Sequence, residues 1–216
     1  MTLDIWLSLA LIHITAVVTP GANFLAVTQT ALTRSRRAGV WVARGIITGS
    51  LIHVIAGLIG VAGIISRIPA LFAAIRLLGA VYFAYAGFKM LQAAYREFRQ
   101  REAKAAPQAD LTDPFQLTDL TPAQAYRRGL LTHLSNPASM LYYVSVFTGF
   151  VPLTASLGDK VLVTVGLIGT TTVWYSLVAL VFSQANIRHF YLRLMPYMNA
   201  LFGILWIGLA VKLISS

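Results

Sequence analysis

Two short segments combine a proline with polar side chains inside long apolar runs. The first reads Val18-Thr19-Pro20-Gly21-Ala22-Asn23, and the second reads Ser135-Asn136-Pro137-Ala138-Ser139. A proline removes one backbone donor and clashes with the preceding helical turn, and an adjacent glycine lowers the cost of leaving helical geometry. The pattern therefore predicts that a helix is interrupted at each of the two segments.

An interrupted helix exposes backbone groups that can bind a ligand. Freed carbonyl and N–H groups can contact a polar or zwitterionic molecule, and the positive end of a half-helix favours its carboxylate. An ordinary proline kink is the alternative interpretation of either motif alone, but two matching motifs favour a ligand site. The residues predicted to bind the ligand are Thr19, Pro20, Gly21, Asn23, Asn136, Pro137 and Ser139.

Histidine is the residue type best suited to carry a proton within these runs. The runs contain no Asp or Glu, apart from Asp4 at an edge. Histidine titrates near physiological pH, so a coupling role is predicted for His53, with His133 and His13 as weaker candidates. The alternative is a neutral histidine that is hydrogen-bonded between helices. Arg44 lies at the start of an apolar run, where a gate could use it to attract a substrate carboxylate.

The composition requires a membrane around these motifs. Hydrophobic residues make up 57% of the 216 residues and charged residues only 11%, whereas a soluble domain usually carries about 25% charged residues. Because a bilayer core needs roughly 20 apolar helical residues, we expect an all-α integral membrane protein. The six predicted spans are Ile5–Val27, Gly45–Ser66, Pro69–Leu91, Gly129–Leu153, Val161–Ser183 and Tyr197–Ile214.

The basic residues predict how these spans are oriented. Loops after the first, third and fifth spans carry eleven Lys and Arg residues, against two (Arg67 and Lys160) in the alternate loops. Cytoplasmic loops are the basic ones, so both termini are predicted to be periplasmic in a multi-pass protein. The net charge of +10 is thus interpreted as a topology signal rather than as a nucleic-acid surface. The amino terminus lacks a basic leader and is expected to remain as the first span.

The chain is predicted to be a single transport domain, residues 1–216, built from two similar halves. The first repeat covers residues 1–91, a cytoplasmic connector covers 92–126, and the second repeat covers 127–216. Three spans per half force opposite orientations, which is the pattern of inverted-repeat transporters. Tyr95–Lys104 is a candidate continuation of the third helix. Small residues predicted to allow close helix packing are Gly45, Gly49, Gly79 and Gly87.

The order and spacing of several motifs resemble a known family. These motifs are Thr19-Pro20-Gly21-Ala22-Asn23, Arg37-Ala38-Gly39, Gly45-Ile46-Ile47-Thr48-Gly49, Gly79-Ala80-Val81-Tyr82, Gly87-Phe88-Lys89 and Leu134-Ser135-Asn136-Pro137. Together they are similar to those of the LysE/RhtB superfamily of bacterial amino-acid exporters. The resemblance implies six helices, some of them broken at proline, and an inner-membrane location. It also implies proton-driven secondary export of amino acids or related small zwitterionic metabolites.

Two departures from the family pattern bear on substrate and coupling. Family members often have a second proline where Ala22 stands, and many carry Asp where Asn23 stands. The second motif usually continues Asn-Pro-Lys, but Ala138 occupies the third position here. The departures leave substrate identity and coupling open, and they do not affect the expected fold.

Other functions are less well supported by the sequence. Metal-cation efflux would need clustered carboxylates or histidines, and a non-transporting membrane scaffold would not need two broken helices. The chain has no cysteine and no metalloprotease, nucleophile-elbow or nucleotide-loop motif, so neither an enzyme, a resident metal nor a cofactor is expected. The expected partners are an amino-acid-like substrate, protons and the lipid bilayer, and a second copy of the chain is a candidate partner.

Overall fold

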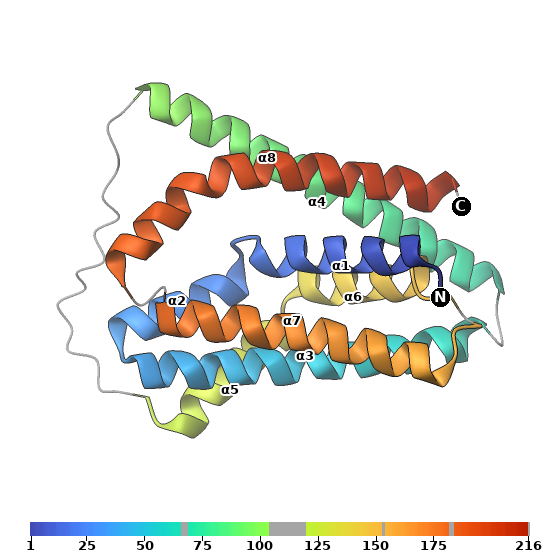
Figure 1. The fold of residues 1–216 in the computed structure, drawn as a ribbon, viewed down its shortest axis with the longest axis horizontal. Coiled ribbons are helices and arrows are strands. Elements are labelled where there is room, and N and C mark those ends of the chain that lie inside the picture. The colour runs from blue at the N-terminus through green and yellow to red at the C-terminus, as the bar shows by residue number, and fades with distance from the viewer. Residues whose placement is uncertain (66–68, 104–119, 153, 182–183, 216) are drawn as a thin grey trace.

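The computed structural model is a bundle of helices (Figure 1), so the expectation of an all-helical fold is confirmed. It describes residues 1–65, 69–103, 120–152, 154–181 and 184–215. The helices within these ranges are α1 Leu3–Val18, α2 Ala22–Thr33, α3 Arg36–Ile65, α4 Pro69–Ala103, α5 Pro122–Leu134, α6 Pro137–Gly149, α7 Leu157–Val181 and α8 Ala185–Ser215.

The first predicted interruption separates α1 from α2. Thr19 has an extended backbone, with ψ at 126°, because the ring of Pro20 disfavours the helical region for the residue before it. Gly21 is also extended and precedes the first residue of α2. The two helices meet at an angle of 44°, which is a break and not a gentle bend.

The second interruption separates α5 from α6 and is built differently. Asn136 is extended, with ψ at 107°, and its side-chain oxygen accepts a hydrogen bond of 3.0 Å from the N–H of Ala138. Pro137 occupies the first turn of α6, where its missing N–H would have no helical partner in any case. Asn136 is therefore a helix cap, and α6 starts as a new helix rather than as a kinked continuation.

Within the described residues, four helices are long and apolar enough to cross a membrane, and the α1–α2 pair can form a fifth span. The four are within α3, α4, α7 and α8. α5 and α6 have 13 residues each, so neither alone reaches the roughly 20 residues that a span needs. The order of elements nevertheless repeats, since a broken pair is followed by two long helices in each half of the chain.

Several helices extend beyond the predicted spans. α3 begins at Arg36 rather than Gly45, and α8 begins at Ala185 rather than Tyr197. α4 continues to Ala103, as the pattern of its polar end suggested, because Arg, Gln, Glu and Ala favour a helix in water as well. The predicted connector is thus shorter than 92–126, since its two ends are helical. The predicted span ends at Ser66, Leu153 and Ser183 lie outside the described residues.

Long helices from the two halves pack directly on each other. α4 lies along α8, and α3 contacts both α5 and α7 (Figure 1). Glycines allow the close approaches: a Cβ on Gly45 would collide with the backbone of Tyr126, and one on Gly129 with the carbonyl of Val42. The crossing of α3 and α5 is therefore a backbone-to-backbone contact.

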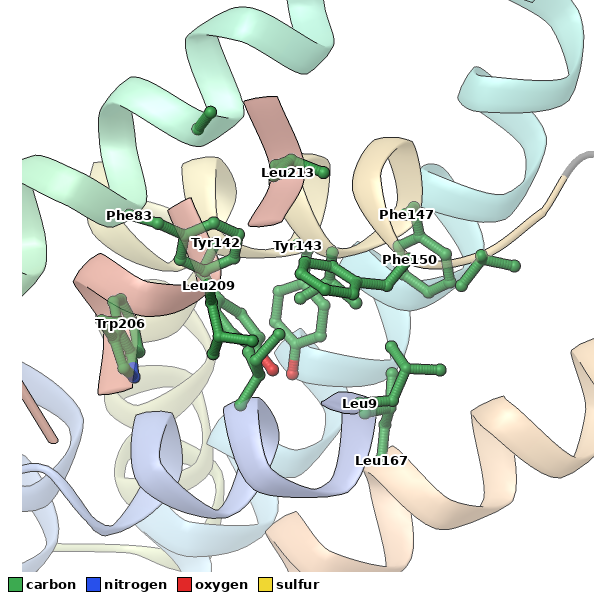
Figure 2. Close-up of a cluster of buried hydrophobic side chains, with 14 of the residues drawn as sticks. Leu9, Phe83, Tyr142, Tyr143, Phe147, Phe150, Leu167, Trp206, Leu209 and Leu213 are labelled. Atoms are coloured by element: carbon green, nitrogen blue, oxygen red, sulfur yellow. The ribbon is translucent and has the colours of Figure 1, made fainter. Parts of the chain in front are cut away.

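Two clusters of buried side chains hold the bundle together. The larger joins α1, α3, α4, α6, α7 and α8 and contains an aromatic group that includes Phe83, Tyr142, Tyr143 and Trp206 (Figure 2). The smaller joins α2, α3, α5 and α7 around Phe24. Aromatic residues from both clusters also reach a cavity between the helices.

Candidate functional site

Both helix interruptions border one cavity of about 400 Å³. Residues from the loop between α1 and α2 and from the start of α6 lie on its wall, although they are more than a hundred positions apart in the sequence. Pro137 does not line the cavity, although its neighbours Asn136 and Ala138 do. The predicted site residues that line the cavity are Thr19, Pro20, Gly21, Asn23, His133, Asn136 and Ser139.

Asn23 and His133 are the central polar pair of this wall. The amide nitrogen of Asn23 lies 3.0 Å from Nδ1 of His133 and 3.5 Å from the hydroxyl of Ser139. The other ring nitrogen of His133, Nε2, lies 3.3 Å from the hydroxyl of Ser50. The side-chain oxygen of Asn23 is buried and has no hydrogen-bond partner among the described residues. The oxygen is thus a buried, unpartnered acceptor in a residue that lines the cavity.

The side chain of Asn136 is partly engaged within the protein. Its side-chain oxygen caps α6 by accepting from the N–H of Ala138. Only the NH₂ group of the amide therefore remains for a ligand. The hydroxyl of Thr19 is engaged similarly, since it donates a hydrogen bond of 2.6 Å to the carbonyl of Thr15 in α1.

His53 lies next to His133 but faces a different cavity. The two imidazole rings are 5.1 Å apart between centroids, and the ring of Tyr143 is 5.6 Å from that of His53. His53 lines a second, mostly apolar cavity of about 320 Å³ between α3, α4 and α6. Tyr143 lines both cavities, so it and the two histidines form the partition between them.

An aromatic wall closes the first cavity on the side of α4, α6 and α8. The hydroxyl of Tyr82 donates a hydrogen bond of 2.9 Å to the carbonyl of Ala138, next to the second interruption. Tyr142 stacks on Trp206 with ring centroids 6.2 Å apart. Sequence reasoning could not decide which aromatic residues were pocket walls and which were interfacial anchors. The structure assigns Tyr142, Tyr143, Tyr175 and Trp206 to the wall.

Lys89 is a site residue that sequence reasoning did not select. It lies on α4 with its ammonium 5.7 Å from the ring centre of Tyr85. Among the described residues that line the first cavity, Lys89 is the only Lys, Arg, Asp or Glu. The sequence does show a lysine two residues before the end of the predicted span Pro69–Leu91. A lysine near the end of a span usually extends its ammonium to the membrane surface, so its position alone did not indicate a site.

Two further candidates lie away from the cavity. Arg44 is exposed on α3, and its guanidinium stacks over the ring of Trp41 at 4.3 Å. His13 is buried, with Nε2 2.8 Å from the carbonyl of Leu167 and Nδ1 2.8 Å from the hydroxyl of Tyr142. Because a carbonyl only accepts, Nε2 carries the proton of neutral His13, and Nδ1 accepts from the hydroxyl of Tyr142. His13 therefore holds one wall residue in place.

The described residues of the cavity wall combine one cation, Lys89, with the unpartnered oxygen of Asn23 and with His133, among aromatic and aliphatic side chains. The LysE type translocator family matches residues 14–216, which is nearly the whole chain. The chain belongs to this family. It is accordingly a multi-pass membrane transporter and not an enzyme.

Individual relatives of the translocator match along almost their entire length. It is 31% identical over 220 residues to the threonine efflux protein of Escherichia coli (strain K12), an alignment that covers 99% of each chain. It is 30% identical over 201 residues to the leucine efflux protein of Salmonella choleraesuis (strain SC-B67), which covers 91% of this chain and 88% of the relative. No solved structure matches the translocator.

Proposed function

We propose that this translocator exports small neutral amino acids, or closely related zwitterions, across the bacterial inner membrane in exchange for protons. The observation that carries the proposal is the cavity at which both helix interruptions meet, with Lys89 and the open oxygen of Asn23 on its wall. Its volume of about 400 Å³ is in the usual range for small-molecule sites, roughly 300–1,000 Å³.

The charges of an amino acid match the groups of this wall. The carboxylate is expected to bind near the ammonium of Lys89 and near the amino end of α2, where backbone N–H groups favour an anion. The substrate ammonium is expected to donate to the side-chain oxygen of Asn23. The aromatic rings of Tyr82, Tyr142 and Trp206 then surround the substrate side chain with mostly apolar surface.

The substrate class follows from the wall and from the relatives together. The efflux proteins named above act, by their names, on threonine and leucine, which are both small and uncharged at the side chain. The described residues of the cavity wall include no Asp or Glu that would select a second positive charge. Threonine and leucine are therefore the first substrates to test.

The histidine pair is the proposed path of the coupled proton. His133 faces the substrate cavity, and His53 faces the second cavity on the other side of Tyr143. Their ring centroids are 5.1 Å apart, close enough for a proton to pass through one intervening group. Histidine is the wall residue whose ordinary pKa allows it to exchange protons near neutral pH.

We propose the six-span arrangement with inverted halves as the framework of this transport. The repeated order of a broken pair and two long helices supports it, as does the pairing of α4 with α8 and α3 with α7. In that arrangement α1–α2 and α5–α6 each count as one span, and both termini are periplasmic. Arg34 after α2, Arg96 and Arg99 near the end of α4, and Arg127 and Arg128 in the first half of α5 then lie toward the cytoplasm.

Metal-cation efflux has less support. Among the described residues no three His, Cys, Asp or Glu side chains gather into a group that could hold a metal ion. A scaffold without transport activity would have no use for a polar cavity at two helix interruptions.

The decisive experiment is counterflow in proteoliposomes. Purified protein is reconstituted into vesicles loaded with unlabelled threonine or leucine, and uptake of the labelled amino acid is followed with lysine and glutamate as comparison substrates. We expect counterflow for the neutral amino acids, and accumulation against the gradient once a pH gradient is imposed. An Asn23→Leu variant that retains its melting temperature should show neither. Equal, uncoupled leakage of all four amino acids would contradict the proposal.

A further inference from the structure

The amide of Asn23 has two chemically opposite ends at the cavity wall. Its NH₂ group only donates hydrogen bonds, and its carbonyl oxygen only accepts them. The NH₂ group faces Nδ1 of His133 at 3.0 Å, and the oxygen is buried without a partner among the described residues. A half-turn of the amide about its last side-chain bond would exchange the two ends without moving the backbone.

The present orientation fixes the protonation state of His133. Because the NH₂ group donates, Nδ1 of His133 must accept and carries no proton. The single proton of the neutral ring is therefore on Nε2, which donates to the hydroxyl of Ser50 at 3.3 Å. A Cβ on Gly49 would lie 3.0 Å from the His133 side chain, so the ring is held closely against α3 and has little freedom to turn instead of the amide.

We propose, resting on the proposed function, that protonation of His133 at Nδ1 turns the Asn23 amide and so releases the substrate. A proton on Nδ1 would face the NH₂ group of Asn23, two donors in contact. The half-turn replaces this by a hydrogen bond from Nδ1–H to the Asn23 oxygen. The NH₂ group then occupies the position of the acceptor, where it repels the substrate ammonium. Proton and ammonium thus compete for one amide oxygen.

The surroundings of His133 leave the amide as its adjustable partner. The titratable groups that face His133 are His53 from α3 and Tyr143 from α6, with ring centroids at 5.1 Å and 6.1 Å. Across the cavity lie Lys89, Tyr82 and Tyr85 from α4, Tyr142 from α6 and Tyr175 from α7. The described residues of this wall include no carboxylate that could neutralise the imidazolium. The Asn23 oxygen is the acceptor within reach of the new N–H.

The competition gives an exchange of one proton for one ammonium at this wall. A hydronium ion in one of the two cavities transfers its proton to Nδ1 of His133 and becomes water, so that one O–H bond breaks as the Nδ1–H bond forms and the Nε2–H bond stays intact. Substrate binding, in the reverse direction, holds the Asn23 oxygen toward the ammonium and expels the proton. The two ligands are coupled through a single side chain, so each must weaken the other's affinity by the same factor.

The test is the pH dependence of equilibrium binding to purified protein. Labelled threonine is compared with its 2-hydroxy analogue, 2,3-dihydroxybutanoate, whose hydroxyl can donate or accept and therefore fits either amide orientation. Below the pKa of His133, the Kd for threonine should rise about tenfold per pH unit, while the Kd of the analogue changes less than about twofold. The same pH slope for both ligands would overturn the proposal.

Two variants separate the switch from a general role of the site. Asn23→Asp presents an acceptor in either orientation. Threonine should therefore still bind to this variant, but its Kd should no longer rise as the pH falls. His133→Gln cannot take up the proton, and it should also bind threonine without a pH slope. Lys212→Met changes an exposed lysine of α8 that is bonded to Ser8, away from the cavity, and should keep the slope. An unchanged slope in Asn23→Asp would contradict the competition.

A spectroscopic readout keeps the switch testable even if threonine does not bind. Nitrogen-15 NMR of histidine-labelled protein should show Nδ1 of His133 unprotonated at high pH and gaining a proton as the pH is lowered, with the assignment made from His133→Gln. In wild-type protein the Asn23 NH₂ resonance should shift in the same titration. If the NMR titration is as expected but no counterflow is measured, the proposed substrate is rejected and the switch is not. If Nδ1 of His133 stays unprotonated over the whole titration, the switch is rejected.

Discussion

Gly87 of α4 and Gly203 of α8 face each other through their backbones. A Cβ added to Gly87 would lie 2.7 Å from the carbonyl oxygen of Gly203, and one added to Gly203 would lie 2.8 Å from that of Gly87. The two positions are 116 residues apart, close to the separation of 117 between Pro20 and Pro137. Corresponding helices of the two halves therefore meet at nearly corresponding residues.

This contact predicts that Gly87→Ala destabilises the protein. A methyl group there must push α4 and α8 apart, and overpacking of this kind costs about 1–3 kcal/mol. The matched control is Gly208→Ala on the same pair of helices, because a Cβ at Gly208 would have no neighbour within 4 Å. Thermal unfolding in detergent should give a lower midpoint for Gly87→Ala and no loss for Gly208→Ala. Equal midpoints would argue against a close helix crossing.

The two prolines should respond differently to replacement by alanine. Pro20→Ala is expected to let α1 and α2 merge and to reduce export while the protein remains folded. Pro137→Ala should have the smaller effect, because the Asn136 cap still starts α6. Asn136→Ala removes that cap and should cost about 1 kcal/mol of stability. Export assays and unfolding midpoints on the three variants would check this order, and equal losses of export in both proline variants would refute it.

Lys89→Met is predicted to weaken substrate binding without unfolding the protein. Methionine keeps most of the apolar stem but removes the ammonium that is proposed to bind the substrate carboxylate. A lost charged hydrogen bond of this kind is worth roughly 1.5–3 kcal/mol, or about a tenfold or greater rise in KM. Lys212→Met, at an exposed lysine on α8 bonded to Ser8, is the control and should leave KM unchanged. A similar KM in both variants would remove Lys89 from the site.

His53→Gln is predicted to separate exchange from uphill export. Glutamine keeps hydrogen-bonding capacity but cannot carry a proton, so substrate counterflow should continue and accumulation driven by a pH gradient should be lost. Both are measured in the same proteoliposomes. A variant that still concentrates threonine against its gradient would show that His53 only packs against His133 and Tyr143.

The orientation of the bundle is predicted from its basic loops. Reporter fusions after Ser35, between α2 and α3, should report the cytoplasm, and fusions after Ser215 should report the periplasm. A cytoplasmic carboxyl terminus would contradict the three-plus-three arrangement, because an odd number of spans in each half requires both termini on one side.

Hydropathy predicts the long helices well because lipid permits few alternatives. α4 and α7 begin at or near the predicted residues. The interruption at Pro20 was also readable, since proline restricts the residue before it. The second interruption was also predicted from the sequence, within the single span Gly129–Leu153. Asn before Pro is a usual helix start, but the sequence did not predict two helices of 13 residues each on either side of it.

The composition of the wall could not be predicted in the same way. The apposition of Asn23 and His133, 110 residues apart, depends on how α2 and α5 pack, and no local pattern encodes it. His53 was ranked first by its depth along the helix, yet it faces a separate cavity beyond Tyr143. Lys89 and Tyr82 looked like ordinary residues of an apolar run, because only the packing of α4 against α6 and α8 turns them toward the site.

The unequal construction of the two interruptions has a mechanical consequence. Gly21 provides no side-chain cap for α2 and has open space around its Cα, so the joint between α1 and α2 is compliant. Asn136 ties down the first turn of α6, so the joint between α5 and α6 is stiff. A rocking motion that alternates access between the two faces of the membrane would therefore bend at the first joint and use the second as its fixed pivot. The two halves would then have different roles in the transport cycle: the first half would change its bend between α1 and α2, and the second half would keep the angle between α5 and α6 fixed.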